Sequence, residues 1–300
     1  MALPRLTVAA LLTAVVGRAT AVADDAIPGH AIDRPSNGIV IAGALGVAAG
    51  LSLVPVSTAR ALWKRELFGN TDAAVHARFS PRAARISDAL VGATIAAPLA
   101  YLTGPTIEDA DGDRFVIYGE ALAINLALFQ GVKHLVQRPR PYLYSQLPDV
   151  QRYAAAQGTD AYQSFYSAHA ATAFCAATAG AYLAGAGSTS RTVRAAAWAG
   201  GFAAAAAASN LRVRAGKHFY SDIAIGGAVG IAIGYIVPAL HADGRAYVPS
   251  STDIGAAAAG VLAGGLVSQL LALERLRDAN LSIGPIALSR GAGVGVAGTL

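Results

Sequence analysis

The chain has 300 residues, of which 54% are hydrophobic and 14% are charged, and its mean hydropathy is +0.47. This composition is too apolar for an ordinary soluble domain. The net charge of +5 comes without a basic run interleaved with aromatic residues, which argues against nucleic-acid binding. The single cysteine, Cys175, excludes an intrachain disulfide and a metal cluster held by several thiolates.

The N-terminus has the pattern of a secretory signal peptide. A basic start, MALPR, precedes the short apolar run LTVAALLTAVVG, and small residues follow at Ala21 and Ala23. We therefore expect residues 1–23 to be a signal peptide that is cleaved after Ala23. An uncleaved first anchor helix is the alternative, and both interpretations send the chain into the export pathway.

Six apolar segments follow, each close to the ~20 residues that a helix needs to cross a bilayer. None alternates strictly between apolar and polar residues, so helix is favoured over strand. The sequence thus predicts an all-α fold, a six-helix bundle that is embedded in a membrane or associated with one. The fifth segment is so rich in alanine that a buried helix of a soluble bundle is the alternative for it. The segments comprise residues 38–55, 86–104, 115–136, 168–185, 192–209 and 222–240.

The loops differ in charge. Residues 57–85 form a long basic loop and residues 105–114 a short acidic one, so the positive-inside rule places the first in the cytoplasm and the second outside. The character of the sequence changes again after the sixth segment. We expect a helical domain over residues 38–241, and one more helix with a Gly-rich tail over residues 242–300, for which no role is predicted.

Three polar clusters stand at the ends of apolar segments. In the first, KHLVQRPRP, Lys133 and Arg140 are seven residues apart, so we expect them on one helical face near the break made by Pro139 and Pro141. A guanidinium and an ammonium together suit phosphate. Cations that snorkel to a membrane interface are the alternative.

The second cluster, SFYSAHAATAF, opens the fourth segment. Ser167 is the expected helix N-cap, and His169 falls in the first helical turn. Free amides at a helix start suit an anion, and a histidine beside them could protonate a leaving oxygen. An ordinary cap beside an interfacial histidine is the alternative.

The third cluster is LRVRAGKHFYSD. His218 and Asp222 are spaced i, i+4, so we expect them to share a face at the start of the sixth helix, with the carboxylate bonded to the imidazole. Arg212 lies six residues upstream of the histidine. A local His–Asp pair beside a basic loop is the alternative.

The three clusters lie on the same side of a chain that crosses in alternate directions. Together they hold cations for an anion, a nucleophile, an orienting acid and a proton donor. This set is suited to phosphoryl transfer without a metal or another cofactor.

These clusters resemble the motifs of the PAP2 (type 2 phosphatidic acid phosphatase) superfamily, whose pattern is K-x6-R-P, then P-S-G-H, then S-R-x5-H-x3-D. KHLVQRPRP meets the first motif in full, and the ionisable positions of the other two are present. Three positions depart from the pattern, with Tyr166, Ala168 and Leu211 in place of proline, glycine and serine. The resemblance implies the helical bundle of the PAP2 and haloperoxidase type.

The resemblance also implies a role for each matched residue. His218 would attack phosphorus and form a phosphohistidine, Asp222 would orient it, and His169 would protonate the leaving alkoxide and then activate water. The phosphate oxygens would be held by Lys133, Arg140, Ser167 and Arg212. Two further cations, Arg214 and Lys217, match no motif position, and we expect them at the membrane interface.

The implied function is a metal-independent phosphatase for a lipid-linked phosphomonoester or diphosphate, such as phosphatidate or a polyprenyl diphosphate. A soluble periplasmic acid phosphatase is the first alternative; a vanadium-dependent haloperoxidase and a non-enzymatic membrane protein follow. The loop charges place the site in the cytoplasm, whereas the superfamily usually places it outside. We expect a multi-pass inner-membrane protein of the cell envelope with its site facing the periplasm. The sequence carries no signal of oligomeric state.

Overall fold

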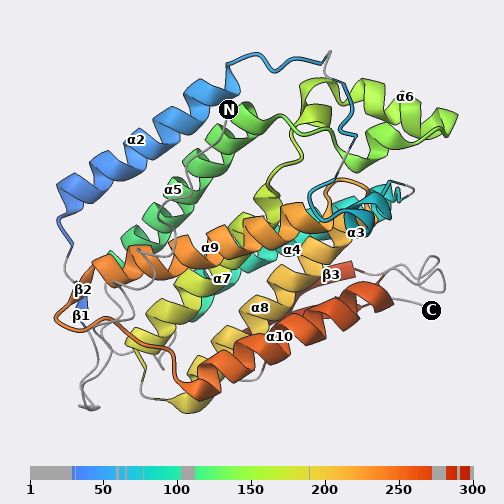
Figure 1. Ribbon diagram of the computed structural model, residues 1–300. Coiled ribbons are helices and arrows are strands. Elements are labelled where there is room, and N and C mark those ends of the chain that lie inside the picture. The colour runs from blue at the N-terminus through green and yellow to red at the C-terminus, as the bar shows by residue number, and fades with distance from the viewer. Residues whose placement is uncertain are drawn as a thin grey trace.

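The computed structural model describes residues 29–30, 32–58, 61–64, 66–76, 78–102, 112–188 and 190–271, together with the backbone of 282–288 and 291–297. The expected signal peptide, residues 1–23, lies outside the described residues. The described chain contains nine α-helices, which run from α2 to α10 (Figure 1). The prediction of an all-α fold is therefore confirmed.

The six apolar segments correspond to six long helices. They are α2 (Arg34–Ser52), α4 (Pro81–Tyr101), α5 (Asp113–Val136), α7 (Ala168–Ala186), α8 (Arg191–Arg214) and α9 (Tyr220–Leu240). A seventh long helix, α10 (Ser251–Leu270), packs along α8, so the bundle is larger than the six helices expected. Glycines allow this addition, because a Cβ at Gly260 or Gly264 would collide with backbone carbonyls of α8.

Short elements stand at the two ends of the bundle. Figure 1 shows α3 (Asn70–Ala73) and α6 (Pro148–Ala156) at the end where α9 begins. The 3₁₀ helices η1 (Pro141–Tyr144) and η2 (Gly158–Tyr162) flank α6. At the opposite end, β1 (Gly29–His30) pairs antiparallel with β2 (Ala242–Asp243). In the Gly-rich tail, β3 (Ser282–Leu288) and β4 (Gly291–Ala297) form an antiparallel hairpin.

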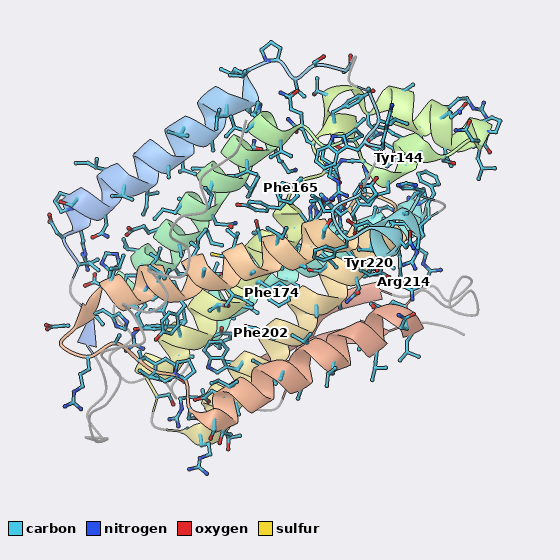
Figure 2. The ribbon with its side chains drawn as sticks, in the orientation of Figure 1. Tyr144, Phe165, Phe174, Phe202, Arg214 and Tyr220 are labelled. Carbon is cyan, nitrogen blue, oxygen red and sulfur yellow. The ribbon has the colours of Figure 1, made fainter. Side chains whose placement is uncertain are left out.

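The core is built around α7, which is buried along almost its whole length. Its neighbours are α9, α8, α4 and α5, and Phe174 of α7 meets Phe202 of α8 with ring centroids 5.4 Å apart (Figure 2). Close approach of α9 depends on glycine, because a Cβ at Gly234 would lie 2.5 Å from the carbonyl oxygen of Cys175. The alanine-rich α8 is enclosed between α7 and α10.

Five described helices, α2, α4, α5, α9 and α10, are long and apolar enough to cross a membrane. Large apolar side chains project outward from the helices at the edge of the bundle. Ile39 on α2 is 73% exposed and Leu262 on α10 is 71% exposed. Burial of such side chains in hydrocarbon is favourable, so these surfaces support a membrane-associated protein.

Candidate active site

The three polar clusters meet at one end of the bundle. They stand at the C-terminal ends of α5 and α8 and at the N-terminal ends of α7 and α9. The clusters are in direct contact, since Arg140 Nη1 lies 3.2 Å from His218 Nε2 and the Ser167 amide donates to the Asp222 carbonyl at 3.1 Å. This end of the bundle is the one that carries α3 and α6 (Figure 1).

Lys133 and Arg140 do not share a helical face, so that expectation is wrong. The helix α5 ends because Gln137 adopts a left-handed conformation with φ of 48°, and the two prolines that follow cannot continue it. Lys133 stays in the last turn of α5, while Arg140 lies in the extended segment beyond it. The two cations therefore approach the site from different directions.

Arg140 is buried, with 2% of its surface exposed. Its Nε donates to the backbone carbonyl of Asp160 at 2.7 Å and its Nη2 to the Asp160 carboxylate at 2.6 Å. Its Nη1 also donates to the carbonyl of Lys217 at 2.9 Å. Although burial raises it, the charges of Arg140, Lys133 and Lys217 hold the pKa of Asp160 below its usual value. The ionised carboxylate thus fixes the guanidinium with its Nη1 towards His218.

Two lysines complete the set of buried cations. Lys133 is 7% exposed and lies within electrostatic reach of Arg140. Lys217 is 8% exposed, so its expected place at the membrane interface is wrong. Its Nζ lies 5.4 Å from the ring centroid of Tyr142 and 5.0 Å from that of Tyr153. Burial, followed by the charge of Arg140, lowers the pKa of Lys217 to about 8.

His218 is fully buried, and each of its two ring nitrogens lies within hydrogen-bonding distance of a polar group. Its Nδ1 lies 2.8 Å from the carbonyl oxygen of Ser164 and 3.7 Å from the Asp222 carboxylate, so Nδ1–H donates to the carbonyl. The lone pair of Nε2 then faces Arg140. Burial, followed by the charges of Arg140 and Arg212, holds the pKa of His218 well below its ordinary value. The imidazole is therefore neutral.

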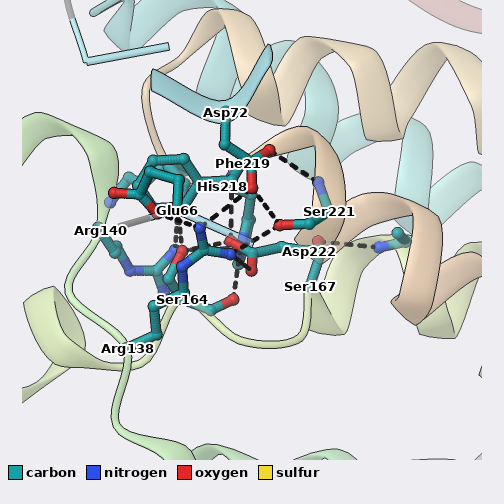
Figure 3. A network of polar contacts seen from close by, with 12 residues as sticks. Glu66, Asp72, Arg138, Arg140, Ser164, Ser167, His218, Phe219, Ser221 and Asp222 are labelled. Carbon is teal, nitrogen blue, oxygen red and sulfur yellow. Dashed lines mark hydrogen bonds and ion pairs between the residues drawn. The ribbon is translucent and has the colours of Figure 1, made fainter. Parts of the chain in front are cut away.

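Asp222 does not hydrogen-bond the imidazole, contrary to expectation. The reason is that α9 begins two residues after His218, so the two side chains do not share a helical face. The carboxylate accepts instead from the Ser164 hydroxyl at 2.5 Å and from the Phe219 amide at 2.9 Å (Figure 3). Asp222 thus positions Ser164, and the Ser164 carbonyl accepts the hydrogen bond from the His218 ring.

Asp88 of α4 joins the second and third clusters. Its Oδ1 lies 2.8 Å from His169 Nε2 and 2.9 Å from Arg212 Nη1. The side chains of His169 and Asp88 are 29% and 58% exposed, so the site opens on this side. Burial, followed by the charge of Arg212, lowers the pKa of His169 to about 4, against the opposing effect of Asp88.

Ser167 caps α7, as its position in the sequence predicts. Its hydroxyl accepts from the amide of Ala170 at 3.3 Å, and the whole residue is buried. His169 follows in the first turn of α7. The amides at this helix start therefore lie beside the residue expected to protonate a leaving group.

The model of the PAP2 superfamily matches residues 114–245 of the chain. This segment contains all three clusters, from Lys133 to Asp222. This match supports the assignment of residues 114–245 to the PAP2 superfamily. No significant match was found among curated proteins or among solved structures. Members of the PAP2 superfamily are typically phosphatases, which supports a hydrolase in general.

Several residues of the site occupy no fixed position of the three motifs. Some come from beyond residues 114–245, because Glu66 and Asp72, which precede α4, contact Arg138 at this end of the bundle. Arg138 and Ser164 had a signal in the sequence, since they stand within the first and second clusters. The others are brought in by contacts between distant segments. These residues are Glu66, Asp72, Asp88, Arg138, Asp160 and Ser164.

Proposed function

We propose that the chain is a metal-independent phosphatase that hydrolyses a lipid-linked phosphomonoester or diphosphate through a phosphohistidine on His218. The observation that carries this proposal is the orientation of the His218 ring, whose Nδ1 lies 2.8 Å from the Ser164 carbonyl oxygen and whose Nε2 lies 3.2 Å from Arg140 Nη1 among buried cations. A neutral ring nitrogen is a nucleophile, and the cations around it would hold the oxygens of a bound phosphate.

In the first step, Nε2 of His218 forms a bond to phosphorus while the bond from phosphorus to the leaving oxygen breaks. His169 donates its proton to that oxygen, which is the role its exposed position on the open side of the site supports. Negative charge on the transferred group would be stabilised by Lys133, Arg140 and Arg212. The proton on Nδ1 of His218 remains bonded to the Ser164 carbonyl.

In the second step, a water molecule attacks phosphorus and the bond to Nε2 breaks. His169, now neutral, takes the proton of the water, and inorganic phosphate leaves. The ring of His218 returns to its neutral form. Asp88 accepts from both His169 and Arg212, so a bound phosphate would compete with this carboxylate for the two side chains.

The five apolar helices support a lipid-linked substrate. The test is release of inorganic phosphate by detergent-purified protein in EDTA, with phosphatidic acid, a polyprenyl diphosphate and p-nitrophenyl phosphate. We expect faster turnover of a lipid substrate than of the soluble ester. No hydrolysis of any substrate would overturn the proposal. Release of the protein from cells by osmotic shock would instead favour a soluble periplasmic phosphatase.

We further propose that the site faces the periplasm. The end of α4 at Tyr101 and the start of α5 at Asp113 lie at the opposite end of the bundle from the site, so a cysteine introduced between them by Glu108→Cys should face the cytoplasm. The native Cys175 is fully buried and gives little background. In intact cells we expect protection of the new cysteine from a membrane-impermeant maleimide. Rapid labelling would place the site on the cytoplasmic side.

His169→Ala is expected to slow transfer from an alkyl phosphate by about 10²–10⁴-fold, the usual contribution of a general acid. The first turnover of p-nitrophenyl phosphate should be slowed much less, because its leaving group needs no proton. Stopped-flow release of p-nitrophenol measures that turnover. His134→Ala, on α5 and bonded to the Gln130 carbonyl, is the control. Equal slowing of both substrates would contradict the role of His169.

Asp88→Asn is expected to change the pH dependence of activity. The carboxylate favours protonated His169, so its loss should lower the pKa of that ring further. At a given pH less of the acid would be protonated, and the alkaline limb of the kcat/KM profile should move to lower pH. Asp149→Asn, in an exposed pair with Arg152, is the control. An unchanged alkaline limb would contradict the contact.

A further inference from the structure

Arg138 occupies the centre of a buried charge cluster beside the site. None of its surface is exposed, and the Glu66, Asp72 and Asp222 side chains around it are 4%, 0% and 0% exposed. Its Nη1 donates to the Asp222 carboxylate and to the Ser221 hydroxyl, each at 2.7 Å. Its Nη2 donates to Glu66 and, at 3.2 Å, to Asp72 (Figure 3).

The surroundings of Arg138 leave it no surface for a phosphate. Both terminal nitrogens are engaged by side chains of the protein, and the guanidinium carbon lies 3.8 Å from the ring centroid of Phe219. Arg140 differs, because its Nη1 reaches Nε2 of His218. Of the two arginines in QRPRP, one therefore faces the reacting nitrogen and the other holds carboxylates.

A continuous series of contacts joins Arg138 to the ring of His218. Arg138 holds Oδ1 of Asp222, whose Oδ2 accepts from the Ser164 hydroxyl at 2.5 Å. The carbonyl of the same Ser164 accepts from Nδ1 of His218 at 2.8 Å. Displacing the Asp222 carboxylate would thus remove the strongest side-chain contact of the residue whose carbonyl fixes the tautomer and direction of the ring.

The other side of the cluster comes from a segment that precedes the PAP2 match. Asp72 in α3 also accepts from the Ser221 amide at 3.0 Å and from its hydroxyl at 2.5 Å. Asp72 therefore bonds both to Arg138 and to Ser221 in the first turn of α9. Buried charges of this kind are stable only as a complete set, since loss of one member leaves the others without compensation.

We propose that Arg138, held by Glu66 and Asp72, is a positioning residue that sets the orientation of His218 through Asp222 and Ser164. This inference rests on the proposed function, because orientation matters most where His218 is the nucleophile. The cations that would hold phosphate are untouched by a change at Arg138. Loss of Arg138 should therefore affect kcat much more than KM.

Arg138→Gln is the direct test. We expect kcat to fall by about 10²-fold with KM little changed, because a small misplacement of a reacting group has an effect of this size. Arg138→Lys keeps the charge but loses the two separate terminal nitrogens of the guanidinium, so it should recover only part of the activity. Arg152→Gln, at an exposed ion pair on α6, is the matched control. An unchanged kcat, or a raised KM with kcat retained, would overturn the proposal.

Asp72→Asn provides a second test that leaves the contact between Arg138 and Asp222 in place. We expect a smaller fall in kcat, about 10-fold, again with KM little changed. Asp149→Asn is its control, since that carboxylate is exposed. Wild-type kcat in a folded Asp72→Asn protein would overturn the proposal even where Arg138 variants do not fold.

A measurement that needs no turnover separates this inference from the proposed function. The chain has six histidines, so ¹⁵N-histidine NMR can follow the His218 ring, with His218→Ala for assignment. We expect Nδ1-protonated His218 in the wild type and a shifted ring signal in Arg138→Gln and Asp72→Asn. A wild type without phosphatase activity would refute the proposed function alone. An unshifted His218 signal in both variants would refute the positioning role.

Discussion

His218→Ala is expected to lower kcat by at least about 10³-fold for every substrate, because loss of a covalent nucleophile removes the reaction path and is the most costly single change in such a site. The buried site offers no other neutral ring nitrogen beside Arg140 among the described residues. Phosphate release from a lipid substrate and from p-nitrophenyl phosphate measures the effect. The loss should be equally severe for good and poor leaving groups.

The control for this variant is His134→Ala, which removes an imidazole from α5 that is bonded to a backbone carbonyl. Both proteins should keep the thermal unfolding midpoint of the wild type within the precision of the measurement. A folded His218→Ala protein that still turns over at the wild-type rate would contradict the mechanism. Loss of activity in His134→Ala as well would show that the activity loss reflects disturbed folding and not the loss of a nucleophile.

The second large effect is expected at Arg140. Arg140→Lys should lower kcat/KM by about 10²–10³-fold, the usual consequence of removing one preorganised donor from the charge that develops in a transition state. Lysine keeps the charge but cannot bond the Asp160 carboxylate and the Lys217 carbonyl while it faces His218. Steady-state kinetics over a range of substrate concentrations measures this loss.

Arg152→Lys is the matched control, because Arg152 pairs with Asp149 on the exposed face of α6. It should leave kcat/KM unchanged. Full activity of Arg140→Lys would contradict the requirement for the several N–H donors of a guanidinium at this position. The single charge of an ammonium group would then suffice to hold the phosphate.

The sequence predicted the convergence of the three clusters, because that signal was local. The three motifs have fixed spacings, and a chain that reverses direction between helices brings their ends together, so Lys133, Arg140 and His218 could be assigned to one site. The cap at Ser167 was also predictable, because the helix that it starts is strongly marked. The meeting of the motif residues was thus predictable without any knowledge of how the helices pack.

The contacts between these residues could not be predicted in the same way. The i, i+4 spacing of His218 and Asp222 suggested a shared helical face, but α9 starts too late for this, and Ser164 takes the hydrogen bond. Asp88 and Asp72 lie on helices that no motif marks. Their place in the site follows from the packing of distant segments, which spacing along the chain does not encode.

The charge pattern of the loops was a poorer guide than the motifs. Several cations near segment ends, including Lys217 and Arg138, are buried in the site and do not lie at a membrane interface. They enter the count of positive charge on that side although they are buried inside the protein. The positive-inside rule therefore loses force where cations at helix ends are buried inside the protein.

The most direct test of the phosphohistidine mechanism is to trap the intermediate. Protein mixed with substrate and quenched in alkali within one turnover can be digested and analysed by mass spectrometry. We expect one acid-labile phosphoryl group on the peptide that contains His218, and none in His218→Ala. A phosphoryl group on another residue, or turnover by the wild type with no phosphorylated peptide under conditions that slow the second step, would contradict the mechanism.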